Sequence, residues 1–443
     1  MALKYNRRVA TNMVVANMIG TGIFTSICFQ VMAPPFGIPD AFSILFIWFI
    51  GGVLAICGAM SYAEVSTTIR QSGGEYTFLS KIYHPIVGFT SGWVSMVVGF
   101  SAAVAALAIA AADYLNPLFL YLFDLESTGI IKPTAIGMIL LVTVIQLSGT
   151  KYGGTFQNII TYFKVVLIAF FILIPFLFSE SSQLSGVSFS PTDNSWNTIF
   201  SLPFAGCLVY VMFSYSGWNA SSYIVGNLQN PRKDLPFSLI TGTFVVMLIY
   251  VLLNFVFLYT CSMEELEGKT GIGNIVIGKI LGKPWEQIFS GLFAISFMAG
   301  INAMFIAGPR VTEQIGRDYR LFSVFNKQNK NEVPIYAILL QTTISISIVL
   351  LMNFQTILQY IELTLSLFCL LTVIGVFVLR AKKMETGETV KTWGYPVTPL
   401  LFILITVWMM AFFIINEPIR LLWTFLTILS GVGLYFAAKR FQK

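Results

Sequence analysis

The sequence is poor in charge and in histidine. Of its 443 residues, 10% are charged and 1 is histidine, whereas a soluble protein carries about 25% charged residues. So little charge excludes a water-soluble enzyme, a nucleic-acid-binding protein and a disordered scaffold. One histidine cannot supply the H-E-x-x-H zinc site of a membrane metalloprotease, and the sequence contains no G-x-S-x-G motif. We therefore expect no catalytic residues, no metal and no cofactor.

Cysteine is also scarce and is scattered through the chain. None of the 5 cysteines forms a C-x-x-C pair, and their spacing does not suggest a disulfide framework. We interpret them as small apolar packing residues. Gly268-Lys269-Thr270 resembles the end of a phosphate-binding loop, but Met263 stands where the first glycine is required. ATP coupling is therefore not expected.

Long apolar runs make up most of what is present. Hydrophobic residues are 56% of the chain, and a membrane-spanning helix needs about 20 of them in succession. The sequence predicts an all-α polytopic membrane protein with twelve transmembrane helices, joined by connections too short for a separate soluble domain. The expected spans lie near 9–33, 41–68, 85–116, 131–149, 153–178, 198–227, 236–261, 285–309, 334–352, 356–380, 396–416 and 418–438.

The distribution of lysine and arginine predicts an orientation. The net charge is +6, and the basic residues cluster between alternate apolar runs rather than along one face. With both termini in the cytoplasm, 20 basic residues fall in cytoplasmic segments and 5 in outer segments, as the positive-inside rule requires. Lys4, Arg7 and Arg8 precede the first run without a signal-peptide cleavage site. We expect a multi-pass cell-membrane protein that contacts membrane lipid and no nucleic acid.

Two of the expected helices contain polar and glycine-rich stretches at mid-depth. The first covers residues 17–24 (Asn-Met-Ile-Gly-Thr-Gly-Ile-Phe) and the second residues 213–219 (Phe-Ser-Tyr-Ser-Gly-Trp-Asn). Glycine costs about 1 kcal/mol in a helix interior, so both stretches favour unwinding. Unwound backbone at this depth persists only where protein or a watery cavity satisfies it. The alternative for either stretch is close helix packing through small residues.

The two stretches lie at equivalent positions, in the first helices of two successive five-span blocks. Because each block has an odd number of spans, the second block enters the membrane from the opposite side. Interrupted helices in inverted repeats are typical of a transporter binding site. Exposed N–H groups there bind an anionic group, and freed carbonyls bind a cation. An α-amino acid is a zwitterion and carries both groups.

Several motifs resemble those of the amino acid–polyamine–organocation (APC) superfamily and of its L-type amino acid transporter (LAT) branch. The motifs are spread over most of the chain in the order of that family. They are Ile19-Gly20-Thr21-Gly22-Ile23-Phe24, Ser72-Gly73-Gly74-Glu75-Tyr76, Ser216-Gly217-Trp218-Asn219, Asn230-Pro231-Arg232-Lys233-Asp234-Leu235-Pro236, Gly308-Pro309-Arg310 and Gly316-Arg317-Asp318.

The resemblance implies a five-plus-five inverted-repeat fold of the LeuT type, with helices 1 and 6 interrupted. The first repeat would occupy residues 1–180, the second 181–392, and a hairpin outside the repeat 393–443. The implied function is sodium-independent, alternating-access transport of neutral L-amino acids, with exchange of one amino acid for another. A proton-coupled symporter and a permease for cationic amino acids or polyamines remain alternatives, and an intramembrane enzyme is the alternative of a different class.

The family's binding site maps onto the two interruptions. The resemblance places the substrate carboxylate at Thr21, Gly22 and Ile23, the amine at the carbonyls of Met18, Phe213 and Ser216, and an aromatic lid at Phe213. From composition alone, Phe213 would be a core aromatic. The expected substrate-binding residues are Met18, Ile19, Gly20, Thr21, Gly22, Ile23, Phe213, Ser214, Ser216, Gly217 and Asn219.

The sequence departs from the branch in three places. The branch often has glycine where Ser216 stands, and Glu-Glu where Gly226-Asn227 stands. A serine would narrow the pocket, and the missing carboxylates leave the cytoplasmic gate without its usual latch. Animal relatives bind a heavy subunit through a cysteine between spans 3 and 4. Residues 117–131 contain none, so no disulfide-linked heavy subunit is expected.

Two charged residues, Lys164 and Glu362, fall well inside expected spans rather than at their ends, and a charge near the bilayer centre costs at least about 2.5–3.5 kcal/mol. Lys164 resembles the span-5 lysine of the family, whose ammonium bridges spans 1 and 8 where sodium binds in sodium-coupled relatives. It would argue against sodium coupling by repulsion and could carry a coupled proton. The alternative is a snorkelling lysine. Glu362 lies in span 10, where it could line the outer vestibule, hydrogen-bond an interrupted helix or accept a polar or basic substrate side chain.

Overall fold

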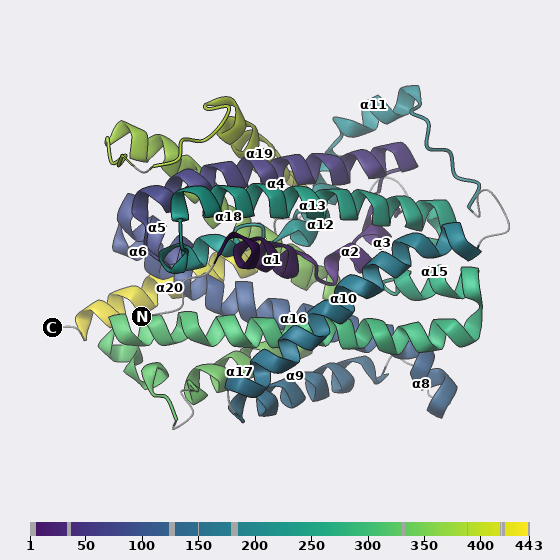
Figure 1. Ribbon diagram of the computed structural model, residues 1–443, viewed down its shortest axis with the longest axis horizontal. Helices are drawn as coiled ribbons and strands as arrows, with labels where there is room; N and C mark the ends of the chain where they lie inside the picture. Colours follow the sequence, from purple (N-terminus) through teal and green to yellow (C-terminus); the bar gives the residue numbers. More distant parts are fainter. Residues whose placement is uncertain are drawn as a thin grey trace.

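The computed structural model describes residues 6–32, 37–123, 129–148, 150–178, 185–329, 333–387, 389–416, 418 and 421–441, without the side chains of 123, 150–161 and 227. The described chain is a bundle of helices, most of which run side by side along the long axis of the molecule (Figure 1). The N and C marks lie at the same end, the left end in Figure 1. We call this end, where α1 begins and α20 finishes, the N-terminal end, and the other the far end.

The helices follow the expected spans in chain order. They are α1 (Arg7–Met18) with α2 (Gly22–Thr25) and α3 (Ile27–Gln30); α4 (Ala41–Ile69); α6 (Pro85–Val94), η1 (Ser95–Ala102) and α7 (Ala103–Tyr114); α9 (Ile131–Leu147); α10 (Thr150–Phe178); α12 (Leu202–Tyr215) and η3 (Ala220–Asn227); α13 (Pro231–Thr260); α16 (Lys283–Asp318); α17 (Ile335–Leu351); α18 (Phe354–Ala381); α19 (Val397–Asn416); and α20 (Leu421–Arg440).

Length and composition alone identify seven of these as membrane-spanning. They are α4, the α6–η1–α7 unit, α13, α16, α18, α19 and α20. Of the other five expected spans, two are shorter helices of 17 residues each (α9 and α17), one is α10, and two are the interrupted helices. Together these account for the twelve-helix, LeuT-like fold predicted from the sequence, and that prediction is confirmed.

Three details differ from the sequence expectation. Span 6 was expected from residue 198, but α11 (Asp193–Ile199) is bent 67° away from α12, so the span begins at Leu202. Span 3 contains a π-helical turn, η1, that no local pattern announces. Short helices also lie outside the spans, namely α5 (Gly74–Ile82), α8 (Asn116–Phe123), α14 (Met263–Leu266), α15 (Ile272–Leu281) and η4 (Arg320–Asn326).

Local sequence explains where several spans begin. The side chains of Asp40 and Asn353 accept hydrogen bonds from the amides of the first turns of α4 and α18, at 2.8 Å in each case. Such caps satisfy amide groups that have no partner within the helix. His84 caps α6 in the same way, with Pro85 at the first helical position. The only histidine therefore has a structural role.

Candidate functional site

Two spans lose their helical conformation at corresponding points. α1 ends at Met18, Ile19 has an extended backbone (ψ 92°), and the helix resumes at Gly22. α12 ends at Tyr215, where Ser216 has ψ 141° and Gly217 has φ +99°, a value that favours glycine. The interrupted helices 1 and 6 predicted from the sequence are therefore confirmed.

The two interruptions lie against each other. A Cβ atom on Gly22 would lie 2.6 Å from the Ser214 Oγ and 2.8 Å from its Cα. A Cβ atom on Gly217 would lie 3.1 Å from the backbone of Asn17. Only glycine permits both approaches, so the glycines that weaken each helix also let the two breaks pack together.

A buried tyrosine joins the two broken ends. The Tyr250 hydroxyl, on α13, lies 2.5 Å from the Met18 carbonyl oxygen and 2.9 Å from the Ser214 carbonyl oxygen. Both carbonyls belong to the last turns of their helices, where intrahelical donors run out. The hydroxyl has one proton and shares it between two acceptors. Tyr250 therefore fixes the distance between the interruptions.

Hydroxyl groups hold the far-end half of helix 1 against α12. The Ser26 and Ser214 hydroxyl oxygens lie 2.9 Å apart, and each also donates to the Tyr210 carbonyl, at 3.2 and 2.8 Å. Ser26 has helical backbone angles and joins α2 to α3, so residues 22–30 form one helical segment. The Ser214 hydroxyl, which was expected to contact substrate, is thus bonded within the protein.

Lys164 reaches the first interruption from α10. Its side chain is buried, and its ammonium donates to the Ile19 carbonyl oxygen at 2.8 Å. Ile19 is the extended residue of the break, so the lysine supplies a donor to a carbonyl that has left the helix. The buried position excludes snorkelling to the membrane surface. The expected bridge to span 8 stays a prediction.

The remaining predicted binding residues divide into two groups. Thr21 and Ile23 are buried beside the first interruption, and Phe213 and Ser216 are half-buried at the second. The Phe213 carbonyl already accepts the Ser216 amide at 3.0 Å and retains one lone pair. The backbone of the first interruption and that of the second therefore lie close together, and the binding roles of these residues stay predictions.

Two predicted residues point elsewhere. Asn219 donates its side-chain amide to Glu75 on α5, at 2.6 Å. The Glu362 carboxylate accepts the Ser366 hydroxyl one turn further along α18, and Glu362 is 5% exposed. Asn219 thus contacts α5 and Glu362 is buried within the bundle. Their roles at the binding site and the outer vestibule stay predictions.

Sequence reasoning missed Tyr250 and the role of Glu75. The available signal for Tyr250 was a tyrosine in the middle of an apolar span, whose hydroxyl must find a partner when buried. Glu75 was recognised only as part of a motif. Tyr62, Asn219 and Tyr223 all donate to it, and the last two are distant in sequence.

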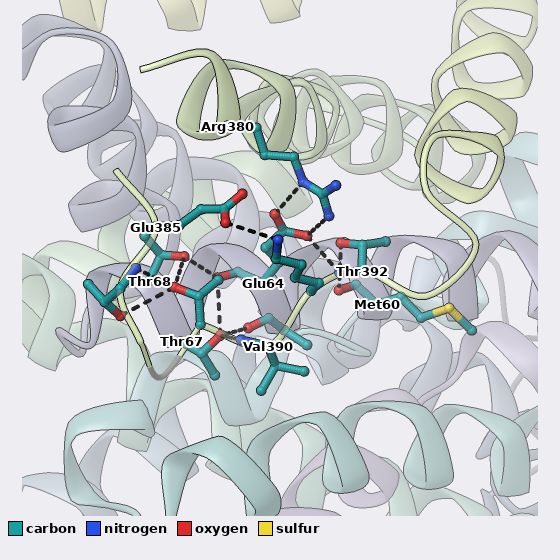
Figure 2. Close-up of polar contacts among 12 residues, drawn as sticks. Met60, Glu64, Thr67, Thr68, Arg380, Glu385, Val390 and Thr392 are labelled. Atoms are coloured by element: carbon teal, nitrogen blue, oxygen red, sulfur yellow. Dashed lines mark hydrogen bonds and ion pairs between the residues drawn. The ribbon is translucent and has the colours of Figure 1, made fainter. Parts of the chain in front are cut away.

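Another buried carboxylate, that of Glu64, lies at the N-terminal end, and Figure 2 shows its surroundings. The Arg380 guanidinium on α18 binds both oxygens of Glu64 on α4, at 2.7 Å each, and the Thr392 amide donates to the same carboxylate at 2.6 Å. The guanidinium also lies 3.7 Å from the Tyr395 ring centroid. This cluster ties α4 and α18 to the segment before α19. Within the described ranges, no group of three or more His, Cys, Asp or Glu side chains could hold a metal ion.

The structure has two interrupted membrane-spanning helices that face each other, and polar side chains from neighbouring spans bond their unwound backbone. This arrangement defines a multi-pass membrane transporter. Comparison with known proteins gives the family. The amino acid permease family model matches residues 8–436, and the chain belongs to this family, within the APC superfamily. Its members are transporters and not enzymes.

The chain is also similar to individual members of the family. It is 26% identical to the serine/threonine exchanger SteT of Bacillus subtilis (strain 168), over 97% of this chain and 95% of the relative. It is 26% identical to the mouse (Mus musculus) b(0,+)-type amino acid transporter 1, over 96% and 85%. Identity to the human (Homo sapiens) large neutral amino acids transporter small subunit 2 is 27%, over 98% and 80%. The predicted resemblance to the LAT branch is confirmed, and amino acid transport is its function.

Proposed function

We propose that the protein exchanges neutral L-amino acids across the cell membrane by alternating access, without sodium. The observation that carries the proposal is the convergence of two unwound backbone segments on one hydroxyl, that of Tyr250. The convergence brings the start of α2 in span 1 close to the ends of α1 in span 1 and α12 in span 6. A zwitterion complements this arrangement of charge.

In the proposed complex, the substrate carboxylate binds the amides of Thr21, Gly22 and Ile23, where the far-end half of helix 1 begins. The amine binds the carbonyls of Met18, Phe213 and Ser216, beside Ile19, Gly20, Ser214 and Gly217. Phe213 closes over the substrate. Backbone groups thus recognise what all α-amino acids share, and the surrounding side chains select among them.

Lys164 supports sodium independence. Its ammonium already supplies a positive charge to the Ile19 carbonyl, at 2.8 Å. A sodium ion at this carbonyl would stand next to that charge in a buried environment, where like charges repel strongly. Exchange is supported by the name of one relative, an exchanger, at 26% identity.

The orientation and organisation of the chain are part of the proposal. The N-terminal end, with both termini, lies in the cytoplasm in this proposal, which the excess of lysine and arginine in those segments supports. Residues 1–180 and 181–392 form the inverted repeats, and residues 393–443 the outer hairpin. Because residues 117–131 contain no cysteine, the chain works without a disulfide-linked heavy subunit.

Counterflow in proteoliposomes tests the proposal. Vesicles preloaded with L-serine should accumulate labelled L-serine much faster than empty vesicles, equally in sodium and in potassium buffer. D-serine in the lumen serves as the control, because it presents the same groups with the wrong geometry. Equal uptake into loaded and empty vesicles would contradict exchange, and a requirement for sodium would contradict the role given to Lys164.

A second candidate is proton-coupled uptake, or transport of cationic amino acids or polyamines. It is favoured by Glu362, a buried carboxylate bonded by the neutral hydroxyl of Ser366. Such a group could take up a proton or pair with a basic substrate side chain. Uptake into empty vesicles driven by an inward proton gradient, or counterflow with L-lysine, would support this function if Glu362→Gln abolished it.

A further inference from the structure

Glu75 is the centre of a contact between two distant parts of the chain. It lies in the first turn of α5 and is 5% exposed. Its carboxylate accepts the Tyr62 hydroxyl from α4 at 2.7 Å, the Asn219 amide from the second interruption at 2.6 Å, and the Tyr223 hydroxyl from η3. Hydrogen bonds to a carboxylate are stronger than those between neutral groups. Glu75 therefore ties the second half of span 6, residues 219–227, to α4 and α5.

The backbone reinforces this contact. The Gly73 amide donates to the Tyr223 carbonyl at 3.2 Å, and the Gly226 amide donates to the Ser72 hydroxyl at 3.1 Å. Gly74 has φ +57°, and a Cβ atom on it would lie 2.3 Å from the Tyr223 ring. Residues 72–75 thus close on η3 through both their side chains and their backbone. We call this set of contacts, with Tyr62 and Asn219, the Glu75 clasp.

The clasp holds an element that has little rigidity of its own. η3 is a 3₁₀ helix with a non-helical residue at Ile224, and 3₁₀ hydrogen bonds have poorer geometry than α-helical ones. It packs against α1, which is itself tied to α13 by an Arg7–Asp234 ion pair of 3.3 Å. These two segments are the halves of the interrupted helices that lie at the N-terminal end.

We infer that Glu75 is the positioning residue that keeps the binding site closed toward the N-terminal end, the cytoplasmic side in the proposed orientation. Opening toward that side requires η3 to leave α5, and the Asn219 and Tyr223 donors then lose Glu75, whereas Tyr62 on α4 keeps it. The transport test of this inference rests on the proposed function. The labelling test rests only on the contacts described here.

The Glu64 cluster offers a matched control. Glu64 is also a buried carboxylate at the N-terminal end, 1% exposed. Its partners are Arg380 and the Thr392 amide, which belong to α18 and the segment before α19 (Figure 2). Loss of this carboxylate should weaken the scaffold without releasing α1 or η3. Glu64→Gln therefore separates loss of a buried charge from loss of the clasp.

The first test compares the KM for L-serine measured from each side of the membrane in oriented vesicles. Apparent affinity falls in proportion to the fraction of protein that is closed to the side tested. Glu75→Gln should lower the cytoplasmic KM, raise the extracellular KM and change their ratio by about fivefold or more. Tyr223→Phe, which removes one donor, should act in the same direction and less strongly. Glu64→Gln should lower the thermal stability and leave the ratio unchanged.

The second test does not depend on transport. Ser222 in η3 is fully buried, and no other group in the described part of the chain bonds its hydroxyl, so Ser222→Cys is a mild change. A membrane-impermeant maleimide should label this cysteine at least about fivefold faster in Glu75→Gln than in the otherwise unsubstituted protein. Glu75→Gln without Ser222→Cys gives the background from the natural cysteines.

The outcomes separate the inference from the proposed function. If the unsubstituted protein does not exchange L-serine, the proposed function is wrong. The labelling rates alone then test whether Glu75 holds η3 closed. An equal labelling rate with intact and substituted Glu75 overturns the clasp, as does a KM ratio that stays constant while exchange continues. If Glu75→Gln does not fold, Tyr223→Phe replaces it in the same two assays, with the same expected direction of change.

Discussion

At the scale of single residues, two buried polar side chains bond the backbone where helix 1 is interrupted. Lys164 donates to the Ile19 carbonyl, and Tyr250 to the Met18 carbonyl and, across the gap, to the Ser214 carbonyl. A buried acceptor left without a donor costs about 1–3 kcal/mol. These residues therefore stabilise an unwound conformation that the apolar surroundings would otherwise make unfavourable.

Replacement of Lys164 should impair transport more than folding. Lys164→Ala leaves the Ile19 carbonyl without its donor, so the exchange rate should fall by about tenfold or more. L-serine counterflow measures the rate, and size-exclusion chromatography checks folding. Lys132→Ala is the matched control, because Lys132 also donates to a backbone carbonyl, that of Leu350, at an exposed site. Unchanged counterflow in Lys164→Ala would remove Lys164 from the mechanism.

Removal of the Tyr250 hydroxyl should weaken substrate binding. Tyr250→Phe keeps the ring but leaves two carbonyls without their shared donor, so the interruptions lose their fixed spacing. We expect the KM for L-serine to rise by about tenfold. Tyr83→Phe is the control, since Tyr83 donates to the Leu371 carbonyl at 2.8 Å, away from the interruptions. A similar KM change in both variants would indicate a general loss of stability instead.

At the scale of helices, the interruptions were predictable because their causes are local. The glycines at 20, 22 and 217 weaken the helix where they stand, whatever packs around them. The bend before α12 and the π turn in span 3 were not predictable, because packing between distant segments determines them. The same holds for Asn219, whose partner Glu75 lies 144 residues earlier in the chain.

The close approach of α2 to α12 leads to a prediction about Gly22. Gly22→Ala places a methyl group 2.6–3.0 Å from Ser214, which forces the two interruptions apart. We expect exchange to fall by more than about tenfold, because misplacement by about 1 Å can cost two orders of magnitude. Gly137→Ala on α9 is the control. A Cβ atom there meets nothing within 4 Å, so exchange should continue. Normal exchange in Gly22→Ala would refute the close packing.

At the scale of the whole molecule, both ends of the interrupted helices are held at once. The Glu75 clasp holds the N-terminal end. At the far end, the Tyr114 hydroxyl donates to the Phe24 carbonyl of α2 at 2.9 Å and accepts the Gly273 amide of α15 at 3.0 Å. Alternating access requires one set of contacts to open while the other stays closed.

Tyr114→Phe should therefore have the opposite effect to Glu75→Gln. Loss of the hydroxyl frees α2 from α15, favours opening at the far end and lowers the extracellular KM relative to the cytoplasmic KM, by about fivefold. The same oriented vesicles and L-serine serve for the measurement. A change in the same direction as that of Glu75→Gln would show that the two ends do not oppose each other.

Because span 3 contains a π turn, the relative position of the side chains on its two sides depends on the number of residues in the span. Before the turn, Trp93 donates to Ser430 on α20 at 3.0 Å, and beyond it Tyr114 contacts α2. One residue of an α-helix corresponds to a rotation of about 100° and a rise of about 1.5 Å. A π turn holds about one residue more than an α-helix of the same reach, so deleting one residue within 95–102 would let it relax to an α-helix with little relative rotation of the two aromatic side chains. Deleting one residue from the α-helical part, 103–113, would instead rotate them by about 100° relative to each other. Only one of them could then keep its partner, so in this part of the span the residue count itself is under constraint, independently of which apolar residues fill it.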